Sequence, residues 1–409
     1  MIIRHVFPVL GNAQYGREAT MGPQADETVD RRVTVEGHLT TDPTLADLII
    51  DISNIVRDRR LGGSEPASLL RLSRAIQAYA RFVENPAVLA YGIADRSLIN
   101  DQHPLLRAPD HQRLKRWHRQ GKVEVQKVAD ERVLELAHLT GIPVMSNDTF
   151  RDHRDVHPWI QGDTNSFVAP KRDETGRVVI ELRRMGHLTS WRVSRYAERK
   201  RLTDQRLADH GRHIRRDILD RLWSCTVGDC VMFGDDTALA QPVPQLRRNA
   251  PHCPLHYVAL SDRGGRPPTA SVKIDRAGKA IGDFLVIEGV DVVVGRDPGP
   301  GGYSLAALTA EPVPLEVSRR HLRFTIDGQL LLVEDLSRNG TAVNTRHGHR
   351  TLRPGETFHL TLGAAIDLPG RLRLRRSGRM FPHELRAHRP SAPQTDAAQG
   401  GAATSSTGA

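Results

Sequence analysis

The spacing of apolar and polar positions along the chain changes character near residue 260. From Leu45 to about Ser190, short apolar runs alternate with segments of helical periodicity. The runs that predict strands are Leu48–Asp51, Ala87–Ile93, the segment starting at Val123, and Ile142–Met145. Strands separated by helices favour an α/β fold with a parallel sheet.

Two helices are expected between these strands. The first has apolar residues at three- and four-residue steps, at Leu69, Leu72, Ile76, Tyr79 and Val83. The second repeats the pattern at Val133, Leu134 and Ala137 and is expected to end at Gly141. A charged, arginine-rich helical stretch then runs from Val193 to Trp223.

Beyond residue 270 the period becomes that of β-strands. The runs VDVVV, HLRFTI, QLLLVED, FHLTL and RLRLR, separated by turn residues, predict an all-β sandwich over residues 271–378. The segment SDRGGRPP, near residues 260–268, is expected to be a linker. Residues 1–44 are expected to be poorly ordered, and residues 388–409 to form a disordered tail.

Composition sets broad limits on this picture. The length of 409 residues suggests two or three domains. A net charge of +10 permits a polyanionic partner such as RNA, although an arginine-rich composition produces the same charge without one. No apolar run approaches the roughly 18 residues of a membrane span, and no signal peptide is recognisable. We therefore expect a soluble, cytoplasmic protein with no membrane partner.

Acidic side chains follow each of the four expected strands. In an open parallel sheet, ligands bind at the carboxyl ends of the strands. The polar residues found there are Asp51, Asn54, Asp95, Asp130, Asp148 and Asp152, the last two on one face of a helix expected to begin at Asp148. Clustered carboxylates suit Mg²⁺ or Mn²⁺, which can activate water for phosphodiester hydrolysis. The alternative is that each aspartate only caps a helix.

The segments LIIDISNIV, ADERVLELA and SNDTFRD resemble the NYN/PIN-like ribonuclease domains of the Regnase type. The resemblance covers about the first 190 residues and assigns residues 45–190 to such a domain. It implies a doubly wound sheet and metal-dependent cleavage of RNA. Carried over by position, the catalytic Mg²⁺ or Mn²⁺ ligands are Asp51, Asp130, Asp148 and Asp152, with Asn54 assisting. Asp95 falls in no motif of the family.

Basic residues near these motifs are candidates for holding RNA. Arg57, Arg59 and Arg60 follow the first strand, and the segment RLKRWHR carries Arg113, Lys115, Arg116 and Arg119 around Trp117. A base can stack on an exposed tryptophan while arginines contact phosphates. The alternative is a solvated basic helix face with Trp117 in the core.

All three cysteines lie between Cys225 and Cys253, within residues 191–262, which we expect to comprise the basic helix and a small metal-binding module. Cys225 and Cys230 form one close pair, and Cys253 and His256 form the other. The spacing predicts a four-ligand Cys₃His zinc site, which is structural because it leaves no open position. The segment resembles a small zinc ribbon, which we expect to brace the flanking domains. The alternative is three buried free thiols and an unrelated histidine.

Three motifs of the sandwich resemble those of the forkhead-associated (FHA) domain. They are VVVGRD, VSRRH and LSRNGTAVN, in that order. The resemblance implies phosphothreonine binding by Arg296, Ser318 and Arg319, with Asn339 holding the peptide backbone and His321 bracing the loop. Arginine and hydroxyl groups suit a doubly charged phosphate. The alternative is a sandwich that keeps Asn339 and Gly340 only as a turn.

The combined hypothesis is a metal-dependent endoribonuclease joined to a phosphothreonine-binding module. The partner of the module is a substrate of a Ser/Thr kinase or a phosphothreonine of this chain. A non-catalytic adaptor that binds RNA or protein is the alternative function, and a nuclease acting on DNA differs from the first hypothesis only in substrate.

Overall fold

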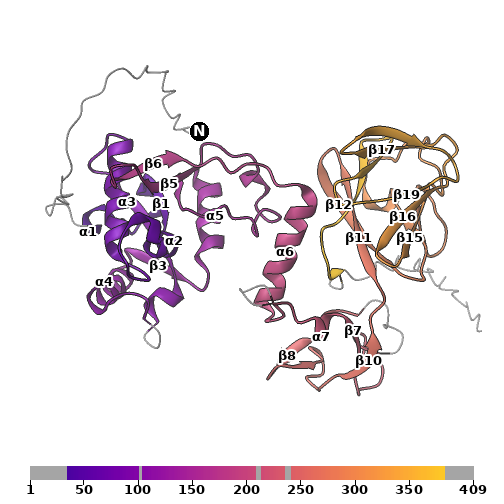
Figure 1. Ribbon diagram of the computed structural model, residues 1–409, viewed down its shortest axis with the longest axis horizontal. Coiled ribbons are helices and arrows are strands. Elements are labelled where there is room, and N and C mark those ends of the chain that lie inside the picture. The colour runs from indigo at the N-terminus through magenta and orange to yellow at the C-terminus, as the bar shows by residue number, and fades with distance from the viewer. Residues whose placement is uncertain (1–34, 101–103, 209–212, 235–240, 383–409) are drawn as a thin grey trace, which may run out of the picture. The chain divides into compact units, whose positions relative to one another are not determined.

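The computed structural model describes residues 35–100, 104–208, 213–234 and 241–382 (Figure 1). They divide into two compact units. The first comprises the described part of the chain up to Asn147 together with Ser166–Leu182, and the second comprises Asp148–Asn165 and the described chain from Arg183 onward. The predictions for residues 1–34 and for the tail from residue 388 fall outside the described residues. No helix within the described ranges is long and apolar enough to cross a membrane.

The first unit is built on a six-stranded sheet in the order β3-β2-β1-β4-β5-β6. Five strands are parallel and the sixth is antiparallel, which confirms the predicted parallel α/β sheet. The order reverses direction between β1 and β4, so polar residues after these two strands meet at a switch point. The strands are β1 (Leu48–Asp51), β2 (Ala90–Asp95), β3 (Val123–Gln126), β4 (Val144–Met145), β5 (Phe167–Arg172) and β6 (Val178–Leu182).

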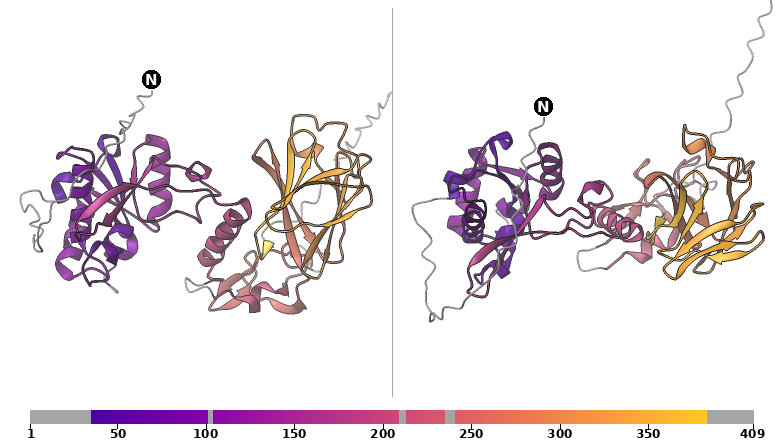
Figure 2. Two further views of the ribbon diagram at one scale, coloured as in Figure 1. Left: turned by 45° about the horizontal axis from the view of Figure 1, so that its top comes forward. Right: turned by 90° about the horizontal axis from the view of Figure 1, so that it is seen from above.

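Helices lie on both faces of this sheet. One hydrophobic cluster joins Leu48 and Ile50 to helices α1 (Val35–His38), α2 (Ile52–Arg57), α3 (Leu69–Phe82) and α4 (Ala108–Arg119). Ile49, which alternates with them, lies outside that cluster, and α5 (Ala129–Thr140) contacts β1 without belonging to it. Figure 2 shows helices on both sides of the sheet. α5 ends where predicted, at Gly141, whose φ of 72° is left-handed.

Residues 35–44 depart from the sequence prediction of poor order. Val35 and Leu39 are buried in the sheet's main cluster, and the amide of Thr40 donates to the carbonyl of Ala90 over 3.1 Å. Val35 begins the short helix α1, and Leu39 follows its end and makes an isolated parallel bridge with Ala90. This pattern is too brief to be recognised among the polar residues around it.

The helix expected to begin at Asp148 does not form. Residues 148–157 are turns and bends, and Phe150 has a φ of 46°. The buried guanidinium of Arg154 donates to the carbonyls of Thr149, Met185 and Gly186. Arg154 thereby joins this segment to residues 185 and 186 and pairs with the Thr149 carbonyl, which a helix would pair internally. The predicted shared helix face of Asp148 and Asp152 is wrong.

The middle of the second unit is less helical and more ordered than predicted. The basic helix, α6, spans Ser190–Asp204, and only a short helix, α7 (Arg216–Leu219), follows it. The predicted linker contains a strand, β10 (Ser261–Gly265), which pairs with β7 (Arg221–Ser224). Asp262 and Arg221 form an ion pair of 2.8 Å across these strands, which explains why so polar a segment is ordered. A hairpin of β8 (Gln245–Arg247) and β9 (Ala250–His252) lies between them in sequence.

The C-terminal part is a sandwich of two sheets, as predicted. One sheet has the order β12-β11-β21-β20-β17-β18 and the other β14-β13-β15-β16-β19. Phe284 and Phe324 meet edge to face between them, with ring centroids 5.1 Å apart. The strands are β11 (Thr269–Arg276), β12 (Lys279–Ile287), β13 (Val292–Gly295), β14 (Tyr303–Ser304), β15 (Leu322–Asp327), β16 (Leu330–Asp335), β17 (Thr341–Thr345), β18 (Gly348–Leu352), β19 (Thr357–His359), β20 (Ala365–Leu368) and β21 (Leu372–Arg376).

Candidate functional site

Three aspartates approach one another at the carboxyl edge of the first unit's sheet. Asp51, at the end of β1, is 2% exposed, and its carboxylate accepts hydrogen bonds from the Asn54 amide (3.0 Å) and the Ser146 hydroxyl (3.2 Å). Burial, together with the nearby charges of Asp130 and Asp95, raises the pKa of Asp51 to about 8. Asp51 does cap α2, but capping does not account for a buried group among like charges.

Asp95 is the member of this cluster that no motif assigned. Its carboxylate accepts the amide of Ala129 (2.9 Å) at the start of α5 and pairs with Arg57 at 3.0 Å. The first contact brings the beginning of α5, and with it Asp130, to the end of β2. Asp130 does not cap α5, because the residue before the helix is Val128. In the sequence, Asp95 could be predicted as a member of the site only from its position at the end of a strand.

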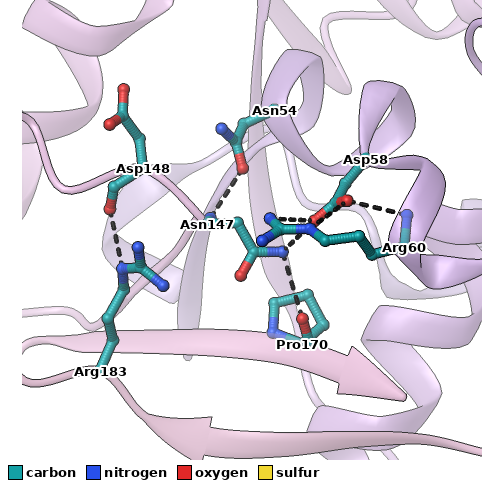
Figure 3. A network of polar contacts seen from close by, with 7 residues as sticks. All are labelled: Asn54, Asp58, Arg60, Asn147, Asp148, Pro170 and Arg183. Atoms are coloured by element: carbon teal, nitrogen blue, oxygen red, sulfur yellow. Dashed lines mark hydrogen bonds and ion pairs between the residues drawn. The ribbon is translucent and has the colours of Figure 1, made fainter.

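Asn54 organises the same edge through backbone and side-chain contacts (Figure 3). Its side-chain oxygen accepts the amide of Asn147 (2.7 Å), and the Asn147 side chain donates to Asp58 (2.6 Å) and to the Pro170 carbonyl (3.1 Å). Asn54 is thus tied to the end of β4 and is fixed in place. Asn54 and Asn147 together set the position at which the chain leaves this edge.

Asp148 and Asp152 belong to the second unit and are described with it. The carboxylate of Asp148 accepts the amides of Thr149 (2.5 Å) and Phe150 (3.1 Å), and its carbonyl accepts Arg183 Nε at 3.0 Å. Figure 3 shows the carboxylate pointing away from the Arg183 guanidinium. Within the first unit the structure groups Asp51 with Asp130 and Asp95. The assignment of Asp148 and Asp152 as metal ligands stays a prediction.

The basic candidates for RNA binding are only partly available. Trp117 is fully buried in the core of the first unit, so it cannot stack on a base. Arg57 is paired with Asp95, and Arg60 with Asp58 at 2.8 Å. Of the two readings of RLKRWHR, the core tryptophan is correct.

The predicted zinc ligands come together in the second unit. The ligand atoms of Cys225, Cys230, Cys253 and His256 all lie within 4.8 Å of one another. Cys225 Sγ is 3.4 Å from His256 Nδ1, and the two other sulfurs are 3.8 Å apart. Backbone amides approach the sulfurs as well, that of Phe233 at Cys230 and that of His256 at Cys253, each at 3.4 Å. Four donors at such distances fit one tetrahedral ion.

At one end of the sandwich, three loops line a cavity of about 640 Å³. The loops follow β13, precede β15 and follow β16. Arginine is the most frequent lining residue; the lining comprises Arg296, Asp297, Pro298, Gly299, Leu315, Ser318, Arg319, Arg320, Leu336 and Arg338. We call these the recognition loops. They bring three of the predicted phosphate-binding residues, from segments more than 20 positions apart, to one cavity.

Backbone contacts fix the first two recognition loops against each other. The amide of Arg296 donates to the carbonyl of Ser318, and that of Asp297 to the carbonyl of Arg319, both at 3.1 Å. A Cβ atom at Gly295 would lie 2.0 Å from the Arg319 carbonyl oxygen, so only glycine permits this approach. The backbones of residues 296 and 319 are thereby held next to each other, and the Arg296 side chain donates from Nε to the Val317 carbonyl at 3.4 Å.

His321 holds the second loop from beneath. It is 3% exposed; its Nδ1 accepts the Ser318 amide (2.9 Å), and its Nε2 lies 3.1 Å from Thr341 Oγ1. Burial lowers the pKa of His321, which favours the neutral ring that this pair of contacts requires. The bracing role expected for His321 is therefore visible in its contacts.

The third recognition loop presents Asn339 to solvent. The amide of Gly340 donates to Ser337 Oγ (3.0 Å), and the amide of Ser337 donates to buried Asp335 (2.7 Å). Gly340 has a φ of 84°, the left-handed conformation of a tight turn. Asn339 is exposed beside this turn. The turn contacts do not use its side chain, so a turn alone does not explain an asparagine here.

Comparison with known families decides what this sandwich is. The model of the FHA domain family matches residues 292–363. The C-terminal sandwich is an FHA domain. The match includes all three recognition loops. A search among curated proteins finds no match for the chain.

Solved FHA domains resemble the same part of the chain. The Rv0020c FHA structure is 30% identical, covers 28% of this chain and 96% of its own, with a TM-score of 0.19. An FHA domain studied for phosphothreonine-dependent interactions is 26% identical over 27% of this chain and 96% of its own, at TM-score 0.20. The human APLF FHA domain, complexed with an XRCC1 bisphospho peptide, is 18% identical over 26% and 97%, at TM-score 0.21.

Two arginines of the FHA domain were not predicted as phosphate-binding residues from its motifs. Arg320 and Arg338 line the cavity of the recognition loops and are exposed. The Arg338 amide also donates to Ser318 Oγ at 3.4 Å, which joins the third loop to the second. Both stand inside quoted motifs, SRRH and SRNG, so the signal was arginine content rather than a motif position.

Proposed function

We propose that this chain is a phosphothreonine-dependent binding protein that acts through its FHA domain. The observation that carries the proposal is the fixed register of Arg296 and Arg319 at one cavity, set by paired backbone hydrogen bonds. Guanidinium groups bind a dianionic phosphate through charge-assisted hydrogen bonds, and the fixed backbone brings both of them to the phosphate without rearrangement of the loops. The Ser318 hydroxyl supplies a further donor to a phosphate oxygen.

The rest of the peptide is held next to the phosphate. Asn339, exposed at the third loop, offers an amide that can both donate to and accept from an extended peptide backbone. Leu315 is 79% exposed at the edge of the same cavity and offers apolar contact to a neighbouring peptide side chain. The ligand is thus a phosphothreonine in an extended segment, from a kinase substrate or from this chain.

Fluorescence anisotropy with a degenerate phosphothreonine peptide pool tests this function on the full chain. The phosphorylated pool is expected to bind, and the unphosphorylated pool is not. Arg319→Ala should weaken binding, whereas Arg353→Ala, an exposed arginine of the same domain outside the recognition loops, should not. Equal binding of both pools to wild type would refute the proposal.

We propose metal-dependent ribonuclease activity as a second function, of the first unit. Its support is the buried Asp51 with Asp95 and Asp130 as charged neighbours, because such a cluster is relieved by a divalent cation. Mg²⁺ or Mn²⁺ would be held by Asp51 and Asp130 and would activate a water for phosphodiester cleavage. Asn54 orders the loop at the end of β4 beside them.

Incubation of labelled RNA and DNA with Mg²⁺, Mn²⁺ or EDTA tests the nuclease. Wild type is expected to cleave RNA only with metal, and Asp130→Asn to abolish cleavage. Glu84→Gln, which neutralises an exposed carboxylate of the same unit, is the matched control. Metal-dependent binding of RNA without cleavage would instead support the adaptor. Cleavage of DNA alone would change the substrate class.

We propose a structural zinc ion at Cys225, Cys230, Cys253 and His256. The support is the convergence of four soft donors around one point, with backbone amides directed at two of the sulfurs. The surrounding residues Leu202, Trp223 and Phe233 form a small hydrophobic cluster with Cys230 and Cys253. A cluster this small needs such a cross-link to be stable.

A further inference from the structure

The second unit contains another cavity, of about 430 Å³, that shares no lining residue with the recognition loops. Its walls come from α6, α7, residues 266–270, the turn between β15 and β16, residue 362 and residues 376–381. The recognition loops adjoin the start of β15 and the end of β16, whereas this cavity adjoins the turn at their other ends. Six-residue strands span roughly 20 Å. The two cavities therefore lie at opposite ends of the same strand pair.

Arginine dominates the charge of this second cavity. One aspartate, Asp220, faces five arginines, and it pairs with Arg216 at 3.4 Å. Two of the five are oriented by local contacts: Arg195 Nε donates to the Gly378 carbonyl (3.1 Å), and Arg216 lies 5.6 Å from the Phe381 ring centroid. The five are Arg195, Arg216, Arg266, Arg376 and Arg379.

The other three arginines are only partly compensated among the described residues. Arg266 donates from Nη1 to the Gln241 carbonyl at 3.3 Å and has Asp220 as a charged neighbour. The Nε atoms of Arg266 and Arg379 are buried, and within the described part of the chain neither meets a hydrogen-bond acceptor. Burial lowers the pKa of Arg266 to about 10 and lowers that of Arg376 as well, the latter with no charged neighbour contributing. Half-buried guanidinium groups that outnumber the carboxylates around them are unfavourable, so a cavity with one aspartate and five arginines favours a negatively charged ligand.

The rim of the same cavity is apolar. Leu330, Leu362 and Met380 line it and are 42%, 38% and 42% exposed. Exposed large apolar side chains beside half-buried cations suit a ligand that has a charged end and an organic body. A volume of about 430 Å³ is within the range of small-molecule sites, roughly 300–1,000 Å³.

The wall that carries these residues is firmly anchored. The buried carboxylate of Glu198, on α6, accepts the amides of Met380 and Phe381 at 2.7 and 2.8 Å. Phe381 is buried in the hydrophobic cluster that includes Cys230 and Cys253. Arg379 therefore precedes a segment that is fixed both to α6 and to the hydrophobic cluster around Cys230 and Cys253. This gives the cavity a pre-formed wall.

We propose that this cavity binds a small organic phosphate of nucleotide size. Its phosphate lies against Arg266, Arg376 and Arg379, and its organic part against Leu330 and Leu362. The arginines converge on one cavity from several segments rather than forming a stripe, which favours a compact ligand over a polynucleotide backbone. Because the lining joins α6, α7 and the FHA domain, the ligand stabilises their packing.

Isothermal titration calorimetry on the full chain, with inorganic phosphate, pyrophosphate and AMP as probes, tests the inference. AMP should bind more tightly than inorganic phosphate, because only AMP uses the apolar rim. Arg376→Gln and Arg266→Gln should each reduce AMP affinity at least tenfold, and Leu362→Ser should reduce AMP binding more than pyrophosphate binding. Arg353→Gln, an equal change of charge elsewhere on the FHA domain, should leave affinity within twofold.

Several outcomes would overturn the inference. One is the absence of binding by all three probes. Another is loss of binding in Arg296→Ala with retention in Arg376→Gln, which places the probe at the recognition loops. If Arg353→Gln and Arg376→Gln weaken AMP binding equally, the attraction is non-specific. If the chain prefers single-stranded RNA to AMP, the cavity is part of a polynucleotide-binding surface. Each variant without ligand should unfold at the wild-type temperature, so that a loss of binding is not caused by misfolding.

Discussion

The α/β unit and the FHA domain both carry polar side chains at strand ends, but with opposite charge and opposite burial. In the α/β unit, Asp51 is 2% exposed and has Asp95 and Asp130 as neighbours of the same sign. In the FHA domain, Arg319 and Arg320 are exposed, and the backbone beneath them is what is fixed. In the first arrangement, neighbouring charges of the same sign raise the free energy of the folded unit. In the second, the arginines are exposed, and only the position of their backbone is fixed.

This difference determines what a ligand does in each case. A cation at the aspartates removes repulsion and burial cost, so it should raise stability strongly. A phosphate at the recognition loops meets groups already solvated and in place, so it should bind without altering the domain. Removing charge should accordingly stabilise the ligand-free α/β unit and leave the FHA domain's stability unchanged.

The largest expected effect lies outside both regions and tests whether they are independent. Cys253→Ser should reduce bound zinc from about one ion per chain to none, because it removes one of the four ligands. It should also unfold the hydrophobic cluster around Cys230 and Cys253, because a structural zinc contributes folding free energy directly. Elemental analysis and hydrogen exchange measure the two effects, with protection in the α/β unit retained. His252→Asn, adjacent but outside the ligand set, should keep its zinc. Zinc retained in Cys253→Ser would contradict the site.

The next effect sharpens the FHA side of the comparison. Arg296→Ala should weaken phosphothreonine peptide binding roughly 10- to 100-fold, the loss expected for a charge-assisted hydrogen bond. Its melting temperature should remain within a degree or two of wild type, since the backbone amide of residue 296 still donates to Ser318. Calorimetry of binding and of unfolding on the same sample separates the two quantities. A large fall in stability would show that Arg296 supports the fold instead.

At Asp51, in contrast to Arg296, removal of the charge should stabilise the ligand-free α/β unit. The Asp51 pKa of about 8 lies above the unfolded value, so its contribution to stability is present below pH 4 and is lost as pH rises through 8. Without metal, wild type should lose up to about 1.4 kcal/mol per pH unit across that window, and Asp51→Asn should not. Urea unfolding from pH 5 to 9, with and without Mg²⁺, measures this. If Glu84→Gln flattened the profile equally, the effect would not belong to Asp51.

The smallest effect concerns His321. Its pKa is lowered by burial, so its stabilising contacts are complete at neutral pH and are lost as pH falls through the folded value, below its ordinary range. A protonated Nδ1 can no longer accept the Ser318 amide. Between pH 7 and 5 the FHA domain should lose stability by about 1 kcal/mol, the scale of one hydrogen bond. In His321→Gln the slope with pH should be smaller, whereas an unchanged slope would assign it to another group.

Local pattern was sufficient for much of this fold. The spacing of Leu69, Leu72 and Ile76 predicted α3, and Gly141 marked the end of α5, because both depend on neighbours within one helix. The cysteine spacing likewise predicted a four-ligand cluster, whose donors converge. The FHA motifs predicted the fold of the sandwich and the loops that form its cavity.

The failures share a physical cause, which is contact between residues distant in sequence. The segment after Asp148 is not helical because Arg154 pairs with carbonyls about 30 residues away. Likewise, the polar segment around Asp262 is a strand because it pairs with β7, where Asp262 lies opposite Trp223 and its carboxylate pairs with Arg221. Asp95 joins Asp51 through tertiary packing that no single motif contains.

The central claim is that the FHA domain binds phosphothreonine through its pre-arranged recognition loops. The most direct measurement is the affinity of one phosphothreonine peptide, selected from the degenerate pool, for wild type, Arg296→Ala and Arg319→Ala, with the dephosphorylated peptide beside it. We predict measurable binding that requires the phosphate and falls at least tenfold in both variants. Binding that survives dephosphorylation, or that is unchanged in both variants, would contradict the account.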